Sequence, residues 1–111
     1  MPSQPVAQLR VSLAEVEPTV WRRLLVPGSV RLDGLHRMLQ AAMGWDDSHL
    51  HCFEIGGVRW GMQLDDYPDD EQDEKSITVM GLFDVADQAT YEYDFGDGWE
   101  HELVFESRWR S

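Results

Sequence analysis

The residues best suited to chemistry in this sequence are histidines and aspartates in two short segments. His49 and His51 alternate along one predicted strand, and Asp94, Asp97 and His101 flank a Gly-Asp-Gly turn. Imidazole and carboxylate groups together suit a divalent transition metal such as Zn, Mn, Fe or Ni. A metal held by these side chains would activate water, with a carboxylate as the base. The spacing therefore predicts a candidate metal or acid–base site, with a divalent transition metal as its cofactor.

Each residue of this candidate site also has a structural interpretation. Asp97 suits the turn because its short side chain bonds the nearby backbone. His101 on an aromatic face is typical of a core histidine, and His49 can simply end its strand. Clustered titratable groups are not by themselves proof of function, so both interpretations stay open.

A β-hairpin must position the second half of this site. Apolar and charged residues alternate on both sides of Gly96-Asp97-Gly98, which is typical of a hairpin. If these three residues form the loop, Tyr93 pairs with His101, and the large apolar groups, Trp99 included, share one buried face. A two-residue turn would pair Asp94 with His101 and mix the faces, so we expect the three-residue loop.

Aromatic and arginine residues form a second candidate, a ligand pocket. Its members are Trp21, Arg22, Trp45, Tyr93 and Trp99. Such aromatic sets stack bases in single-strand binding proteins and line small-molecule sites. Core packing is the alternative, because a small domain needs large aromatic side chains to bury enough surface. Arg22 would then pair with a carboxylate or stack on a tryptophan.

An acidic stretch at about residues 62–76 is the third feature. It lacks the ligand spacing and central glycine of a calcium loop. We expect a long, solvated loop. The functional alternative is a decoy surface for a basic partner.

The remaining pattern predicts one α+β domain over residues 1–111. Hydrophobic alternation predicts strands, and helical spacing predicts one main helix. The expected strands lie near residues 6–15, 20–26, 49–55, 58–60 and 77–80, with a hairpin over 91–106 and a helix over 32–43. Gly44 would end that helix. We expect a roll-like, mainly antiparallel sheet of hairpins packed on one principal helix.

Composition limits the partners. The formal net charge of -12 makes duplex nucleic acid an unlikely ligand class, because phosphate contacts need a basic face. The single Cys52 rules out an internal disulfide and fits a reducing compartment. No apolar run is long enough to span a membrane. We therefore expect a cytoplasmic protein without a membrane partner.

Four segments together resemble a known family. They are Pro18-Thr19-Val20-Trp21-Arg22-Arg23, Leu35-His36 followed by Met43-Gly44-Trp45, His49-Leu50-His51-Cys52-Phe53, and the run from Tyr93 to His101. In this order they resemble the plasmid pRiA open-reading-frame-three-like family, also labelled insertion-element passenger TnpR-like proteins. The resemblance covers about residues 6–106. It implies a compact α+β roll and no established activity.

The resemblance also implies a difference in length. Typical members continue past the last strand, so we expect this chain to be a C-terminally short member. Apolar surface left exposed at that end would then be covered by self-association.

These observations favour a small, non-catalytic accessory or interaction protein, which the resemblance associates with plasmids or mobile elements. No nucleophile constellation is evident, and Cys52 lies in an apolar strand without an evident basic partner. We expect a protein partner or self-association. The alternative is a metal-binding or metal-assisted hydrolase-like protein using the hairpin from Asp94 to His101. Single-strand nucleic-acid binding through the tryptophans is a third hypothesis.

Overall fold

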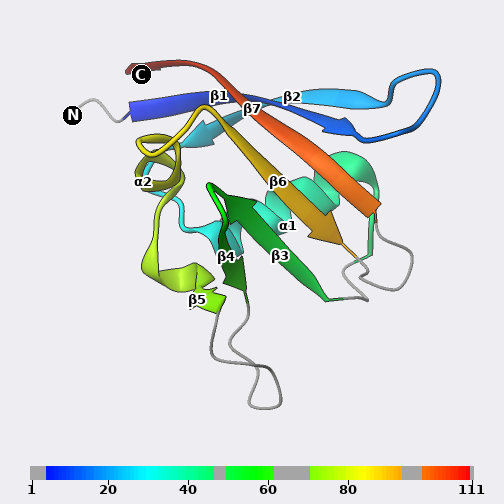
Figure 1. The fold of residues 1–111 in the computed structure, drawn as a ribbon. Coiled ribbons are helices and arrows are strands. Elements are labelled where there is room, and N and C mark those ends of the chain that lie inside the picture. Colours follow the sequence, from blue (N-terminus) through cyan, green and yellow to red (C-terminus); the bar gives the residue numbers. More distant parts are fainter. Residues whose placement is uncertain (1–4, 47–49, 62–70, 94–98, 111) are drawn as a thin grey trace.

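The fold of this chain is built around one twisted sheet. The computed structural model describes residues 5–46, 50–61, 71–93 and 99–110. Its strands are β1 (Pro5–Leu13), β2 (Trp21–Pro27), β3 (His51–Ile55), β4 (Val58–Gly61), β5 (Glu71–Asp73), β6 (Gln88–Tyr93) and β7 (Trp99–Arg110). The helices are α1 (Leu32–Met43), the 3-10 turn η1 (Glu74–Ser76) and α2 (Val79–Phe83). The seven strands lie in the order β2-β1-β7-β6-β3-β4-β5 (Figure 1).

Strand β7 lies at the third position of this sheet and joins its two parts. It pairs antiparallel with β1 on one side and with β6 on the other. β3 pairs with both β6 and β4 in antiparallel fashion. The last ladder, between β4 and β5, is parallel. β7 thus connects the β2-β1 pair to the β6-β3-β4-β5 group.

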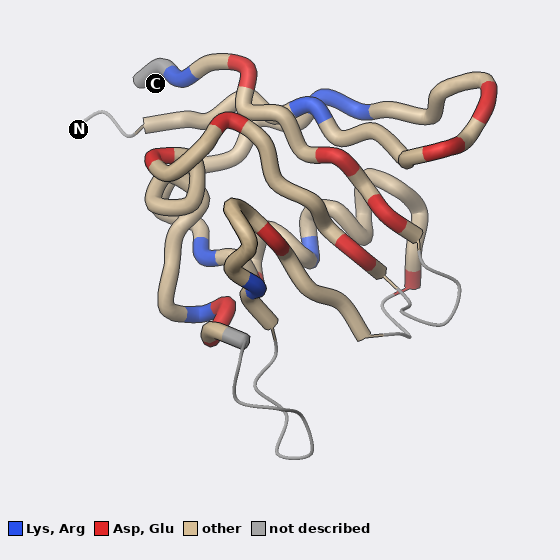
Figure 2. The backbone as a smooth tube through the Cα atoms, in the orientation of Figure 1, with Lys and Arg blue, Asp and Glu red and all other residues tan. Residues whose placement is uncertain are grey.

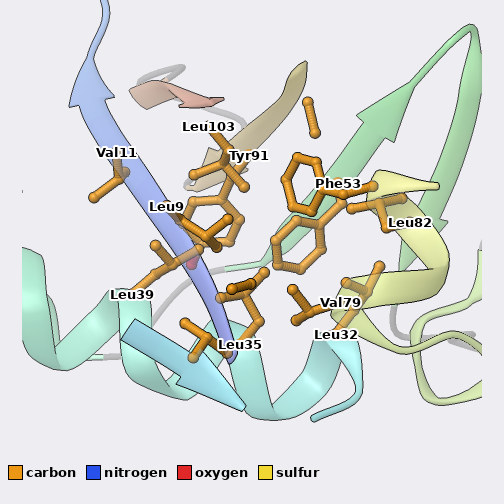
Figure 3. Close-up of a cluster of buried hydrophobic side chains, with 14 of the residues drawn as sticks. Leu9, Val11, Leu32, Leu35, Leu39, Phe53, Val79, Leu82, Tyr91 and Leu103 are labelled. Atoms are coloured by element: carbon orange, nitrogen blue, oxygen red, sulfur yellow. The ribbon is translucent and has the colours of Figure 1, made fainter. Parts of the chain in front are cut away.

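Both α-helices contribute to a core on one face of the sheet. Helix α1 places its apolar stripe, Leu32, Leu35 and Leu39, in this core, because residues three and four apart share one side of a helix. Alternate residues of the strands meet that stripe, since successive strand side chains point to opposite faces. The core members labelled in Figure 3 include Leu9, Val11, Phe53, Val79, Leu82, Tyr91 and Leu103.

The strand side chains that point away from the core lie on the opposite face of the sheet. No helix of the described residues lies over it (Figure 1). The side chains of Arg10, Glu54, Glu100 and Glu102 are exposed there. We call this surface the open face.

The expected fold class is wrong. The sheet is a seven-stranded mixed sheet, rather than a roll of hairpins packed on one principal helix, and a second α-helix, α2, joins α1 in the core. Two ladders, β1–β7 and β3–β6, join strands that are distant in sequence. Hairpins leave a local signature in sequence, whereas distant and parallel pairings do not.

The expected hairpin register is also wrong, by two residues. Tyr93 pairs with Trp99, and Tyr91 pairs with His101. A shift of two residues keeps every side chain on its original face, so Tyr91, Tyr93 and His101 are buried as expected. Trp99, however, is 36% exposed, contrary to its expected burial. The Gly96-Asp97-Gly98 loop itself lies outside the described residues.

The principal helix is confirmed over Leu32–Met43. Gly44 ends it in the left-handed conformation, with φ 76°, and its N–H donates to the Gln40 carbonyl. Where a short strand or strand entry is expected at Ile77–Met80, the structure has an isolated bridge between Thr78 and Arg31. Val79 and Met80 instead begin α2, which Thr78 caps by accepting from the Gly81 N–H at 3.1 Å. Neither α1 nor α2 has the length and apolarity needed to cross a membrane, nor does any other helix in the described part of the chain.

Candidate functional site

The structure describes only part of the predicted metal or acid–base site. His49, Asp94 and Asp97 lie outside the described residues, so the metal site remains a prediction. His51 and His101 are both described and both buried. They occupy different hydrogen-bond networks, and each ring has at least one nitrogen bonded to a partner inside the protein.

His101 is held through both ring nitrogens. Its Nε2 lies 3.2 Å from the indole nitrogen of Trp45, and its Nδ1 lies 3.2 Å from the Tyr91 carbonyl oxygen. Because an indole N–H only donates, Nε2 accepts and Nδ1 carries the proton that it donates to the carbonyl. Burial lowers the pKa of His101, and backbone hydrogen bonds oppose that effect. The imidazole is therefore neutral at pH 7 and acts as a link between β6, β7 and Trp45.

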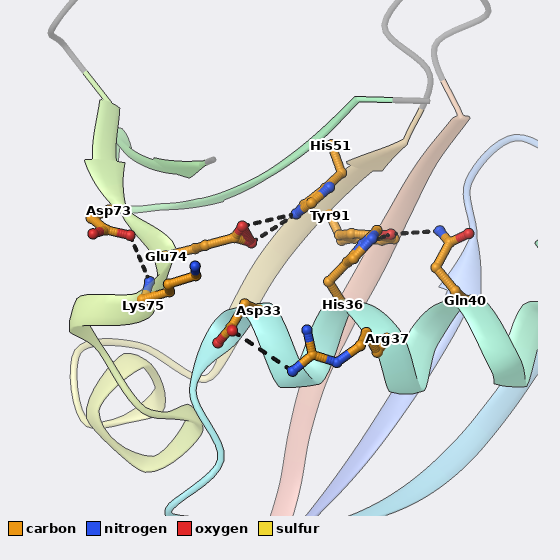
Figure 4. A network of polar contacts seen from close by, with 9 residues as sticks. All are labelled: Asp33, His36, Arg37, Gln40, His51, Asp73, Glu74, Lys75 and Tyr91. Carbon is orange, nitrogen blue, oxygen red and sulfur yellow. Dashed lines mark hydrogen bonds and ion pairs between the residues drawn. The ribbon is translucent and has the colours of Figure 1, made fainter. Parts of the chain in front are cut away.

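His51 forms a buried pair with Glu74. Its Nε2 lies 2.7 Å and 3.2 Å from the two carboxylate oxygens (Figure 4). Glu74 is only 4% exposed, so the expectation of a solvated acidic loop is wrong at this residue. A buried carboxylate needs a close hydrogen-bonding partner, and here His51 supplies it. The contact therefore joins η1 to β3.

A second histidine stacks on His51. The rings of His36 and His51 lie 3.5 Å apart and nearly parallel, at 8°. The Nδ1 of His51 is buried and has no hydrogen-bond partner among the described residues.

The network continues through Tyr91. The Gln40 side-chain amide donates to the Tyr91 hydroxyl at 2.8 Å, and that hydroxyl lies 2.7 Å from Nδ1 of His36. The Tyr91 hydroxyl therefore accepts from Gln40 and is also hydrogen-bonded to His36 (Figure 4).

Sequence reasoning missed His36 and Gln40 as parts of a site. The signal was present, because two polar residues at i and i+4 interrupt the buried side of α1. Such positions in an apolar stripe require buried polar partners. Tyr91 and Glu74 were assigned to the hairpin and the acidic stretch, where nothing local indicates that they meet. In the described part of the chain, no three His, Cys, Asp or Glu residues are grouped closely enough to hold a metal.

The predicted aromatic pocket divides into two places. Trp45 packs against Tyr93 and Trp99, with 5.6 Å between ring centroids in each case. Trp21 instead lies on β2 at the open face, where Ser12 is its partner in register. Arg22 lies beside it and donates to the Trp21 carbonyl at 2.8 Å. The five residues therefore do not form one pocket.

Carboxylates gather on the open face over β7, β6 and β3. Glu92 lies directly opposite Glu100 in the β6–β7 ladder, and like charges in such a position are destabilising. Glu54, Glu100 and Glu102 line a groove of about 470 Å³ together with Thr90. We call Glu54, Glu92, Glu100 and Glu102 the acidic end of the open face (Figure 2).

The thiol of Cys52 lies next to this acidic end. Cys52 lines a smaller hollow of about 120 Å³ with Glu54 and Arg59. The Arg59 guanidinium donates to the Cys52 sulfur at 3.0 Å. The expectation that Cys52 lacks a basic partner is therefore wrong, because β4 brings Arg59 to it from outside its own strand.

The β1–β2 end of the open face is arginine-rich and partly apolar. Two guanidinium groups lie over the Trp21 ring, with Arg10 4.8 Å and Arg23 5.3 Å from its centroid. Trp21 is 40% exposed and Leu25 is 55% exposed. We call Arg10, Trp21, Arg23 and Leu25 the basic end of the open face.

One ion pair connects the basic end to β7. Arg23 donates to both carboxylate oxygens of Glu106, at 2.8 Å and 3.2 Å. This contact lowers the pKa of Glu106 and raises that of Arg23. A two-point contact of this kind fixes the direction of the guanidinium, which keeps Arg23 on the open face.

Comparisons with known proteins place these features in a family context. The family model described as plasmid pRiA4b ORF-3-like protein matches residues 5–111. Uncharacterized protein y4hQ of Sinorhizobium fredii is 42% identical over 103 residues, which are 91% of this chain and 53% of that protein. A crystal structure of a protein of unknown function, MM3350 from Methanosarcina mazei Go1, superposes with a TM-score of 0.89 at 32% identity. The match covers 97% of this chain and 63% of that one.

The chain therefore spans about half of the curated relative and under two thirds of the solved chain. The printed names of both relatives give no activity.

Proposed function

Because this chain belongs to the plasmid pRiA4b ORF-3-like family, whose two relatives above have no assigned activity, we propose that it is a non-catalytic interaction domain. Its binding surface is the open face, and its ligand is a positively charged segment of another protein. The proposal places the domain in the cytoplasm, where its single cysteine stays reduced. It also places the domain among the accessory proteins of plasmids or mobile elements.

The acidic end of the open face carries this proposal. Four carboxylates lie around two neighbouring hollows on an uncovered sheet surface. Glu92 and Glu100 face each other, a placement that costs stability in the free domain. Arginine or lysine side chains laid across this surface would relieve that repulsion and form charge-assisted hydrogen bonds.

The buried histidines support a binding role in a different way. His101 and His51 direct ring nitrogens to partners inside the protein, namely Trp45, the Tyr91 backbone and Glu74. These contacts stabilise the layer beneath the sheet. The open face carries both charge and a groove.

Binding of a short basic peptide tests the proposal. The probe is a fluorescent peptide in which Arg and Thr alternate, and the control peptide has Glu in place of Arg. Anisotropy is measured at about 50 mM and about 500 mM NaCl, because salt screens exposed charges. We expect the Arg peptide alone to bind, and to bind more weakly in high salt.

Two charge-neutralising variants locate the binding surface. Glu92→Gln with Glu100→Gln should raise the Kd at least about tenfold, the equivalent of about 1.4 kcal/mol. Glu15→Gln with Glu17→Gln makes the same charge change in the β1–β2 connection, where both residues are exposed, and should leave the Kd unchanged. An equal rise in Kd in both double variants would mean that the peptide responds to net charge alone, and this would overturn the assigned surface.

A further inference from the structure

One basic side chain lies within the acidic end of the open face. Arg59 of β4 is the register partner of Glu54 on β3, and it lines the smaller hollow together with Cys52 and Glu92. Its Nη2 donates to the Cys52 sulfur at 3.0 Å, and its Nη1 lies 3.9 Å from Oε2 of Glu54. A guanidinium of the protein itself is therefore already present where the proposed ligand would bring its own.

The contact between Arg59 and Glu54 leaves room for a closer one. At 3.9 Å it is an ion pair beyond hydrogen-bond distance, whereas Arg23 meets both oxygens of Glu106 in the same sheet at 2.8 Å and 3.2 Å. The Glu54 side chain is exposed, so a ligand can reach its oxygens from solvent. A guanidinium of the ligand at about 2.8 Å would hold Glu54 more closely than Arg59 does.

The positive charge of Arg59 opposes that approach. Arg59 forms part of the wall of a hollow of about 120 Å³, so a cation that enters the hollow comes close to its guanidinium. Like charges repel at short range, and water reduces the repulsion between exposed groups to a modest energy. The arrangement therefore predicts a moderate loss of affinity rather than a closed site.

Building on the proposed function, we propose that Arg59 is an internal competitor of the basic ligand. In the free domain Arg59 lies beside Glu54, and in the complex a basic side chain of the ligand takes its place there. Arg59 thereby lowers the affinity for every basic segment, so that segments with few basic residues are released while those with several remain bound. It is a specificity-determining residue of the proposed site, and not one of the groups that hold the ligand.

Neutral variants of Arg59 test this role with the fluorescent Arg–Thr peptide at about 50 mM NaCl. Arg59→Gln and Arg59→Met both remove the charge, and each should lower the Kd about three- to fivefold, as expected for one exposed charge pair. Arg37→Gln on α1 is the matched control. Arg37 is exposed and lies 3.7 Å from the carboxylate of Asp33, so this variant changes the net charge equally and should leave the Kd unchanged.

Two further measurements identify charge as the cause. Arg59→Lys keeps the positive charge and should bind the peptide within about twofold of the unchanged protein. In about 500 mM NaCl the advantage of Arg59→Gln should shrink, because salt screens exposed charges. If Arg59→Lys binds as tightly as Arg59→Gln, charge is not the cause and the inference is overturned.

Loss of fold cannot imitate the expected result, because an unfolded variant would bind the peptide more weakly. If the unchanged protein binds the peptide but neither neutral variant binds more tightly than Arg37→Gln, the inference fails and the proposed function stands. If neither the unchanged protein nor the neutral variants bind the peptide, both are overturned.

Discussion

At the residue scale, Glu74 shows how position decides what a carboxylate does. It belongs to a run of acidic residues, yet it is buried while its neighbour Asp73 is exposed. The difference lies in His51, which meets both oxygens of Glu74. Removing a charged group from water is costly unless a hydrogen-bonded partner replaces the water.

Glu74→Gln should therefore lower the free energy of unfolding by about 2 kcal/mol, because it puts an NH2 group in place of one of the two acceptor oxygens that meet His51 in a buried place. Urea unfolding measures this. Asp73→Asn is the matched control, since the exposed Asp73 accepts from the Lys75 N–H and asparagine can do the same. A loss no larger than that of the control would show that the pair contributes little stability.

His101 makes stability depend on pH. Burial lowers its pKa below the ordinary value of 6.5, so the unfolded chain binds a proton more readily than the folded one. The stability from neutral His101 is present above pH 6.5 and is lost as pH falls through the folded pKa. We expect the free energy of unfolding to fall as the pH drops below about 6.5, and to fall less steeply in His101→Gln. Identical slopes would exclude His101 as a source.

At the element scale, the C-terminus of α1 depends on Gly44. Its φ of 76° lies in the left-handed region, which costs a side-chain-bearing residue energy. A Cβ added at Gly44 would meet nothing within 4 Å. The cost of substitution is therefore a backbone cost alone.

Gly44→Ala should destabilise the protein by about 1 kcal/mol. Gly44→Asn should cost less, because asparagine tolerates the left-handed region. Thermal unfolding of the two variants against the unchanged protein gives the comparison. Equal losses of stability in Gly44→Ala and Gly44→Asn would mean that the left-handed backbone angle is not the source of the effect.

The helices and strands differ in how well the sequence predicts them. α1 was predictable to its end residues because its apolar spacing, and a glycine at its end, are local signals. The strand faces were predictable from alternation, and they survived a register error because a shift of two residues preserves them. β5 was not predictable, since its three polar residues pair with β4, and η1 directly after it packs through the distant His51.

The candidate sites, too, were predictable only as far as local spacing reaches. Local spacing drew attention to His51 and His101, but their partners Glu74 and Trp45 lie 23 and 56 residues away along the chain. Trp21 and Trp45 appeared equivalent in the sequence and yet lie on different sides of the sheet. Which aromatic side chains meet depends on the strand order, and that order rests on the distant pairings β1–β7 and β3–β6.

At the scale of the whole molecule, electrostatic repulsion is a general cost. The net charge is -12, and several carboxylates share one sheet face. Self-repulsion of this kind destabilises the compact state, and salt weakens it.

Glu92→Gln should raise the free energy of unfolding by about 0.5 kcal/mol at low salt, because it removes a like-charge pair across the ladder. The gain should shrink in about 0.5 M NaCl. Chemical unfolding at chain concentrations where the midpoint does not depend on concentration isolates the effect from association. Glu15→Gln should show a smaller gain, and an equal gain would attribute the effect to net charge.

The position of β7 also has a consequence for protein synthesis. A ribosome makes β2 and β1 early and β6, β3, β4 and β5 later, but in the strand order only β7 joins the two groups. Until Trp99–Arg110 has emerged, the nascent chain holds two incomplete sheets with exposed edges, which are templates for wrong pairing. Completion of this sheet therefore waits until β7 has been translated, and a nascent chain that stops short of β7 depends on chaperones to keep those edges apart.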